Sequence, residues 1–178
     1  MGNLKQRSGG PLAVKSMRWP VLFAGVLMIG GAAQPQTHTL YPDPAQARPA
    51  ISAALKTAAQ THKRILLDFG ADWCGDCHVL ELYLYNDQNR PLLDANFVLV
   101  HVNVGQYDAN LDLAAKYGIP LERGVPAMAV LSEDGKLLYS QKTGDFAPMR
   151  RMESSAVTRF LVQWKPTRAG CSIMAVNC

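Results

Sequence analysis

Residues 65–77 constrain the fold of this 178-residue chain more than any other stretch. The apolar run 65–69 has the composition of a buried β-strand, and it leads into two cysteines, Cys74 and Cys77, that are separated by two residues. Residues 78–85 follow at once and are compatible with a helix. The partial positive charge of a helix N-terminus favours thiolate over thiol. Two thiols placed there can exchange electron pairs between dithiols and disulfides.

The order of reaction follows from the two positions in the helix. Cys74 precedes the helix, so we expect its sulfur to lie near free backbone N–H groups and to be the nucleophile. Cys77, one turn later and more buried, would attack Cys74 and release the reduced substrate. The alternative is an inert disulfide staple. A ring of so few residues constrains the unfolded chain little, which favours the redox interpretation.

The first 33 residues carry the whole net positive charge of the chain. They contain four basic residues and no acidic residue, whereas the remainder has 14 of each. A basic face on the folded domain, which nucleic-acid binding would need, is therefore not expected. An apolar run of 11 residues, 19–29, precedes the small residues 30–33, as in a secretory signal peptide. Cleavage after Ala33 would place the domain in the periplasm or another exported compartment.

Two alternatives remain open for the leader. An uncleaved leader would anchor the protein to the inner membrane, although the apolar run is shorter than the ~20 residues of a membrane span. Translation could also begin at Met17 instead of Met1, which would give a shorter basic segment before the apolar run.

The rest of the chain predicts one α/β domain over residues 50–165. Residues 34–49, rich in Pro, Gln and Ala, are predicted as a linker, and residues 166–178 as a C-terminal tail. The expected elements are a helix at 50–61, a strand at 65–69, a helix at 74–85, a short helix from Pro91, a strand at 97–104, a helix at 108–117, strands at 127–131 and 137–141, and a helix at 148–164. The first two strands should be parallel and the last two antiparallel, which gives a mixed central sheet with helices on both faces.

This order, with Asp-Trp-Cys-x-x-Cys after the first central strand, resembles the thioredoxin fold. It is most similar to the C-terminal periplasmic domain of the DsbD thiol:disulfide interchange proteins and to small exported thioredoxin-like proteins. The matching residues are Leu67-Asp68-Phe69, Ala71-Asp72-Trp73-Cys74, Cys77, the strand 98–104, Lys116-Tyr117-Gly118-Ile119, Gly124-Val125-Pro126 and Gly144. The departures are Gly75-Asp76 where thioredoxin has Gly-Pro, an insertion at 120–123, and a histidine, His101, where thioredoxin has a lysine near its buried acid.

The resemblance implies roles for residues around the cysteines. Asp68 would accept a proton from Cys77, directly or through water. Pro126 would follow a cis peptide bond and face the cysteines, so that the Val125 backbone could pair with an extended substrate. Trp73 and the intervening Gly75 and Asp76 would contact the substrate, although core packing of Trp73 is the alternative.

Acidic residues beside the cysteines predict a reducing couple. Negative charge on Asp72 and Asp76 would oppose a thiolate on Cys74. A less stabilised thiolate makes the dithiol form less favoured. The alternative is that both carboxylates simply favour the positive helix end and point into water.

Three other interpretations stay open. Cys74-Gly-Asp-Cys77-His78 is also a C-x-x-C-H haem-attachment string, with Met128, Met149 or Met152 as the opposite ligand. Against haem, small c-type cytochromes are mainly helical, whereas several strands surround this string. Zinc on Cys74, Cys77 and His78 lacks a fourth ligand. A thioredoxin-fold binding protein with weak or no catalysis would use the same surface for docking alone.

The remaining expectations concern the tail and the partners. Cys171 and Cys178 would form a structural disulfide in an oxidising compartment, or a second redox pair that exchanges with Cys74. We expect an exported thiol–disulfide oxidoreductase that reduces protein disulfides, acts as a monomer, and needs no cofactor or metal. Its electrons would come from a membrane-embedded dithiol donor of the DsbD type.

Overall fold

A four-stranded sheet forms the centre of the computed structural model, which describes Gly10 and residues 39–167. The strands lie in the order β2 (Phe97–Asn103), β1 (Arg64–Gly70), β3 (Ala127–Leu131) and β4 (Leu137–Ser140). β1 runs parallel to β2 and antiparallel to β3, and β3 and β4 form an antiparallel pair. The predicted mixed sheet is therefore confirmed. The chain divides into two units, 1–36 and 37–178, and the sheet belongs to the second.

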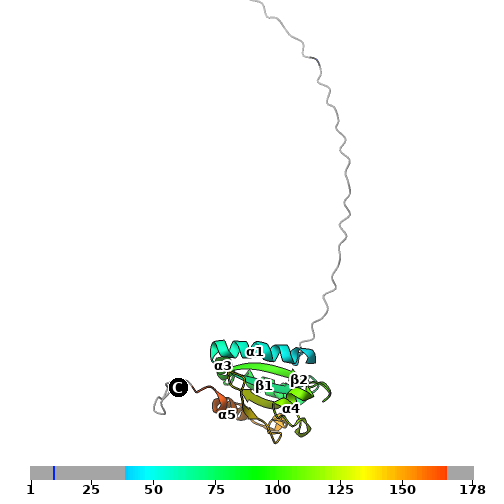
Figure 1. Ribbon diagram of the computed structural model, residues 1–178, viewed down its shortest axis with the longest axis vertical. Coiled ribbons are helices and arrows are strands. Elements are labelled where there is room, and N and C mark those ends of the chain that lie inside the picture. The colour runs from blue at the N-terminus through cyan, green and yellow to red at the C-terminus, as the bar shows by residue number, and fades with distance from the viewer. Residues whose placement is uncertain (1–9, 11–38, 168–178) are drawn as a thin grey trace, which may run out of the picture. The chain divides into compact units, whose positions relative to one another are not determined.

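Helices cover both faces of the sheet (Figure 1). α1 (Ala47–Thr61) and α4 (Leu111–Lys116) bury apolar residues in one core cluster. α2 (Gly75–Leu84), α3 (Arg90–Asn96) and α5 (Ser154–Trp164) contribute Leu and other apolar residues to a second cluster, whereas Cys77 of α2 belongs to the first. None of the helices within residues 39–167 has the length and apolar character needed to span a membrane.

The alternation of side chains along β1 separates the two clusters. Leu67 and Phe69 point to the α1 side, whereas Leu66 belongs to the cluster on the α5 side. Since the side-chain period of a strand is two residues, Asp68 shares the face of Leu66. The parallel register pairs Asp68 with His101 of β2, which brings these two polar side chains together on one face.

The N-terminal part of the domain differs from the sequence prediction. α1 begins at Ala47, and a 3-10 turn, η1 (Pro44–Gln46), precedes it, so part of the predicted linker is folded. Tyr41 is buried in the core cluster on the α1 side. An isolated aromatic residue in a polar stretch can bury a large apolar area, and this gain offsets the ordering of the chain around it.

The C-terminal helix is also shorter than predicted. α5 begins at Ser154, and a 3-10 turn, η3 (Met149–Arg151), takes the place of its first two turns. Two contacts to α2 hold this segment: the Arg150 backbone N–H donates to Asp76, and the Met152 carbonyl accepts from the Tyr83 hydroxyl. Such tertiary contacts override a local helical pattern.

Candidate active site

The two cysteines of the C-x-x-C string form a disulfide at the start of α2. Cys74 is the N-cap of the helix, with extended backbone, and its Sγ accepts a hydrogen bond from the Cys77 N–H at 3.1 Å. Cys74 is 5% exposed and Cys77 is fully buried. The helix N-terminus therefore directs N–H groups at the Cys74 sulfur, where they can stabilise a thiolate.

A proline loop faces the disulfide from the other side. The Val125–Pro126 peptide bond is cis, as the resemblance implied. The Val125 carbonyl oxygen lies 3.5 Å from the Cys74 sulfur. Pro126 is buried immediately before β3, so the sheet fixes the position of this loop against Cys74.

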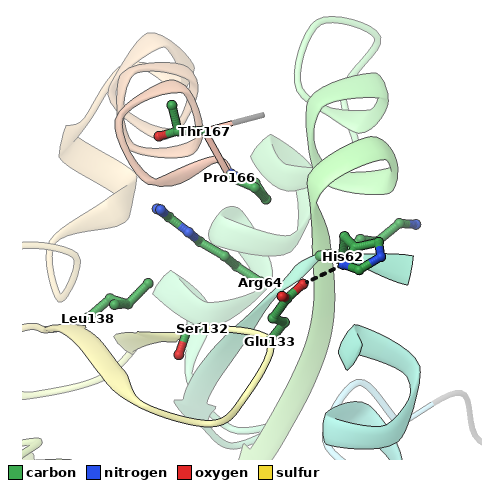
Figure 2. A pocket seen from close by; sticks show the side chains of 8 residues that line it. His62, Arg64, Ser132, Glu133, Leu138, Pro166 and Thr167 are labelled. Carbon is green, nitrogen blue, oxygen red and sulfur yellow. Dashed lines mark hydrogen bonds and ion pairs between the residues drawn. The ribbon is translucent and has the colours of Figure 1, made fainter. Parts of the chain in front are cut away.

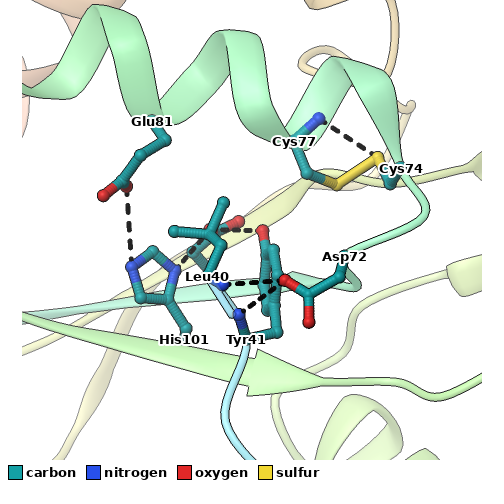
Figure 3. Close-up of polar contacts among 8 residues, drawn as sticks. Leu40, Tyr41, Asp72, Cys74, Cys77, Glu81 and His101 are labelled. Atoms are coloured by element: carbon teal, nitrogen blue, oxygen red, sulfur yellow. Dashed lines mark hydrogen bonds and ion pairs between the residues drawn. A yellow bond between two sulfur atoms is a disulfide. The ribbon is translucent and has the colours of Figure 1, made fainter. Parts of the chain in front are cut away.

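The buried carboxylate of Asp68 is at the centre of a polar network with Tyr41, His101 and Glu81, and Figure 3 shows these three residues near the cysteines. Asp68 Oδ2 accepts hydrogen bonds from the Tyr41 hydroxyl at 2.6 Å and from His101 Nδ1 at 3.0 Å. His101 Nε2 in turn lies 3.6 Å from Glu81 Oε2 on α2. A buried carboxylate needs partners, and these two donors satisfy Oδ2, whereas Asp68 Oδ1 is buried without a hydrogen-bond partner among the described residues.

The network favours a charged histidine. Burial alone would lower the pKa of His101, but the hydrogen bond to Asp68 and the charges of Asp68 and Glu81 outweigh burial and raise it above its usual value. His101 thus supplies positive charge beside the buried acid, where thioredoxin has a lysine.

The two acidic residues next to the cysteines both accept hydrogen bonds from other segments of the chain. Asp72 Oδ1 accepts the backbone N–H groups of Leu40, at 2.8 Å, and Tyr41, at 3.1 Å. Asp76 accepts two guanidinium N–H groups of Arg150, at 3.1 and 2.9 Å, together with the Arg150 backbone N–H at 2.8 Å. These bonds hold the pKa of Asp76 below its usual value. Asp76 does not simply point into water, and Arg150 offsets the negative charge of Asp76, one of the two acidic residues expected to oppose a Cys74 thiolate.

Trp73 presents apolar surface next to Cys74. It is 46% exposed, and its Nε1–H donates to the Gly105 carbonyl at 2.7 Å. The Tyr107 ring lies 5.3 Å away between centroids, and Leu111 is also exposed. Tyr107 and Leu111 line a groove together with Leu121, Glu122 and Gly124. An extended substrate could place apolar side chains on this surface.

The residues considered above as ligands of haem or zinc make other contacts in the structure. The His78 Nε2–H donates to the Asp72 carbonyl at 2.7 Å. Met128 and Met149 are fully buried in the core cluster on the α5 side. Within residues 39–167, no three His, Cys, Asp or Glu side chains are grouped so that they could hold a metal ion. Cys171 and Cys178 lie outside the described residues, so their pairing remains a prediction.

Sequence reasoning missed Tyr41, Arg150 and Glu81 at this site. Tyr41 and Arg150 are separated from their carboxylate partners by 27 and 74 positions, and no local pattern reports such contacts. The one available signal was the apolar pair Leu40-Tyr41 in an otherwise polar segment. Glu81 follows Cys77 by one helical turn, so it could have been placed on the same helix face.

Comparisons with known proteins agree with this geometry. A family profile described as Thioredoxin-like matches residues 46–132. The crystal structure of a disulphide isomerase from Xylella fastidiosa Temecula1 is 37% identical, covers 71% of this chain and 97% of its own, and superposes with a TM-score of 0.68.

Two DsbD thiol:disulfide interchange proteins also match. The Pseudomonas fluorescens protein is 28% identical over 66% of this chain and 18% of its own length. The protein from Pseudomonas sp. (strain JR1 / K1) is 31% identical over 77% of this chain and 22% of its own length. This chain therefore spans about a fifth of the length of these relatives. The profile match, the near-complete coverage of the isomerase structure and the observed fold agree, and the chain belongs to the thioredoxin-like family.

Proposed function

We propose that this protein is an exported thiol–disulfide oxidoreductase that reduces protein disulfides through Cys74 and Cys77. The observation that carries the proposal is the placement of the Cys74 sulfur. It caps a helix, bonds to the Cys77 N–H and lies 3.5 Å from the Val125 carbonyl. A substrate strand on the Val125 side would meet a sulfur that is set to act as a thiolate.

The chemistry proceeds in two exchanges. The Cys74 thiolate attacks a substrate disulfide, forms a mixed disulfide and releases one substrate sulfur as a thiolate. Cys77 then attacks Cys74, which releases the second substrate sulfur and leaves the Cys74–Cys77 disulfide. A dithiol donor reduces this disulfide in turn. The similarity to DsbD proteins supports a membrane-embedded dithiol of that type as the donor.

Reduction of insulin disulfides tests the activity. We expect the wild-type protein to accelerate insulin reduction by dithiothreitol and the Cys74→Ser variant to have no effect above background. Equal rates for the two proteins would contradict the proposal and favour a binding protein that uses Trp73 and the Val125 edge only for docking. Soret absorption in the purified protein would instead favour attachment of haem.

An isomerase is the second candidate, because the relative from Xylella fastidiosa carries that name. The redox equilibrium of the Cys74–Cys77 pair against glutathione separates the two. Arg150 offsets the charge of Asp76 but not that of Asp72. Because negative charge therefore still opposes a thiolate on Cys74, we expect a reducing couple. A potential near the about −270 mV of thioredoxin would support the reductase direction, whereas a potential near the about −180 mV of protein disulfide isomerase, or higher, would contradict it.

The leader supports export to the periplasm. Residues 1–33 combine a basic segment, an apolar run and small residues, so we expect the mature protein to begin at Gln34. Mass spectrometry of the protein from the periplasmic fraction tests this expectation, and a retained leader in the membrane fraction would contradict it. We also propose a monomer, because the cysteines, the acid and the proline loop all come from one chain.

A further inference from the structure

Gly70, the last residue of β1, leaves room for two side chains to converge. A Cβ at this position would overlap the Tyr41 hydroxyl and would lie 2.8 Å from the Cys77 sulfur. The hydroxyl and the sulfur therefore approach the same point beside the backbone of β1. The same hydroxyl donates to Asp68 Oδ2 at 2.6 Å, so it hydrogen-bonds the buried carboxylate and also approaches the point beside β1 that the buried sulfur approaches.

The surrounding structure fixes Tyr41 in this position. Its ring is buried and packs edge-on against His101, with 5.1 Å between centroids. The backbone N–H groups of Leu40 and Tyr41 both donate to Asp72, directly before Trp73 and Cys74 (Figure 3). A group that is held at a reacting atom needs little reorganisation when the proton moves.

The Tyr41 hydroxyl is suited to pass a proton on without becoming an ion. Burial, together with the charge and hydrogen bond of Asp68, raises its pKa far above the usual value. The phenol therefore stays neutral in the physiological range. A neutral hydroxyl donates one hydrogen bond and can accept another at the same time.

We propose that the Tyr41 hydroxyl relays the Cys77 proton to Asp68 during the resolving step; this inference rests on the proposed function. In the mixed disulfide, the Cys77 thiol proton passes to Tyr41 Oη while the Tyr41 proton passes to Asp68 Oδ2. The Cys77 sulfur forms the bond to Cys74, and the bond between Cys74 and the substrate sulfur breaks. Its electron pair leaves on the substrate sulfur, which takes a proton from water. When a donor dithiol later reduces Cys74–Cys77, the Asp68 proton returns along the same path.

The titratable groups that face Asp68 come from several elements. They are Tyr41 from the N-terminal segment, Cys77 and Glu81 from α2, Asp72 from the loop after β1, and His101 from β2. Of these, the Tyr41 hydroxyl donates to the Asp68 carboxylate and approaches the same point beside β1 as the Cys77 sulfur, so it is the group whose removal tests the relay.

The reaction of the reduced protein with 5,5′-dithiobis(2-nitrobenzoate) separates the two exchanges. Replacing Cys171 and Cys178 by serine in the full chain leaves Cys74 and Cys77 as the reacting thiols. Attack by Cys74 releases a first thionitrobenzoate, and attack by Cys77 on the mixed disulfide releases a second. Stopped-flow absorbance then gives one rate for each phase.

We expect Tyr41→Phe to slow the second phase at least about tenfold and to leave the first phase unchanged. Without the relay, Cys77 must ionise in equilibrium with solvent. The rate of the second phase should then rise about tenfold per pH unit below the thiol pKa, whereas the wild-type rate changes little over the same range. Asp68→Asn should slow the second phase similarly, and the double variant should be no slower than the slower single variant.

Tyr83→Phe is the matched control, since it removes a hydroxyl that donates to the Met152 carbonyl at 3.1 Å, away from the cysteines. This variant should retain both wild-type rates. A Tyr41→Phe protein with a wild-type second phase, or with both phases slowed equally, would overturn the relay. A wild-type protein that releases only one thionitrobenzoate would overturn the proposed function together with the relay.

Discussion

Two histidine–carboxylate pairs in this protein have the same separation and very different surroundings. His62 Nδ1 lies 3.0 Å from Glu133 Oε2, with side chains that are 81% and 48% exposed. His101 Nδ1 lies 3.0 Å from Asp68 Oδ2, with side chains that are 17% and 2% exposed. Figure 2 shows the first pair beside a pocket, and Figure 3 shows His101 of the second pair with its contact to Glu81.

The burial of each pair, and not the distance between its partners, determines how much the pair contributes to stability. At His62 the chain leaves α1 in a left-handed conformation, and water competes for both partners there. Exposed pairs of this kind contribute only about 0–1 kcal/mol. In the buried pair, loss of one partner leaves a charge without compensation, which costs about 3–5 kcal/mol. The buried pair therefore couples stability to the charge state of the active site.

Removing the buried histidine should have the largest effect. We expect His101→Leu to lower the free energy of unfolding at neutral pH by about 3 kcal/mol, because the Asp68 carboxylate loses its cation. Glu133→Gln should change it by less than about 1 kcal/mol. Urea unfolding of both variants measures the difference, and similar losses would break the comparison.

Filling the space at Gly70 should have the next largest effect. Gly70→Ala places a methyl group against Tyr41 and Cys77, and we expect a loss of about 1–3 kcal/mol from overpacking. Gly75→Ala is the control, since its Cβ would lie 3.7 Å from Arg150, an ordinary contact. Thermal unfolding compares the two variants. A stable Gly70→Ala protein would show that Tyr41 is not held against β1.

The pH dependence of stability should report the buried pair directly. The pKa of His101 is raised in the folded state, so its contribution is fully present below the unfolded value of about 6.5 and is lost as pH rises through the folded value. The stability difference between the wild type and His101→Gln should therefore be largest below about pH 6.5 and should shrink as the pH rises above that value. A difference that grows with pH would contradict the assignment.

Removing the Asp76–Arg150 pair should have the smallest effect on stability, but it should change the rate at which Cys74 reacts. The pair lies between the two histidine pairs in exposure, and it sits beside Cys74. Arg150→Ala leaves the Asp76 charge without compensation, so we expect Cys74 to react several-fold more slowly with 5,5′-dithiobis(2-nitrobenzoate) at neutral pH. Arg159→Ala, on α5, serves as the control. An unchanged rate would show that Asp76 does not influence the nucleophile.

The sequence was sufficient to predict those parts of the fold and site in which a local residue pattern also carries the chemistry. The apolar run before Cys74 predicted β1, and the two cysteines were predicted at the start of a helix, where the structure has them. The Asp-Gly turn predicted the pairing of β3 and β4. The resemblance to thioredoxin placed His101 near the buried acid, and the two side chains are hydrogen-bonded.

The sequence was insufficient where the site depends on contacts between distant segments. Tyr41 lies in a Pro- and Gln-rich stretch whose composition predicts a linker, yet its hydroxyl reaches Asp68. Arg150 falls in a helical pattern that its own bonds to Asp76 interrupt. Neither contact leaves a periodic signal, because periodicity reports which face is buried and not which partner a polar group finds.

The most direct test of the account is to trap the first exchange. The Cys77→Ser variant cannot resolve a mixed disulfide, so incubation with insulin and peptide mapping by mass spectrometry should find a covalent adduct on Cys74. An adduct on Cys171 or Cys178, or none at all, would contradict the claim that Cys74 is the nucleophile and Cys77 completes the exchange.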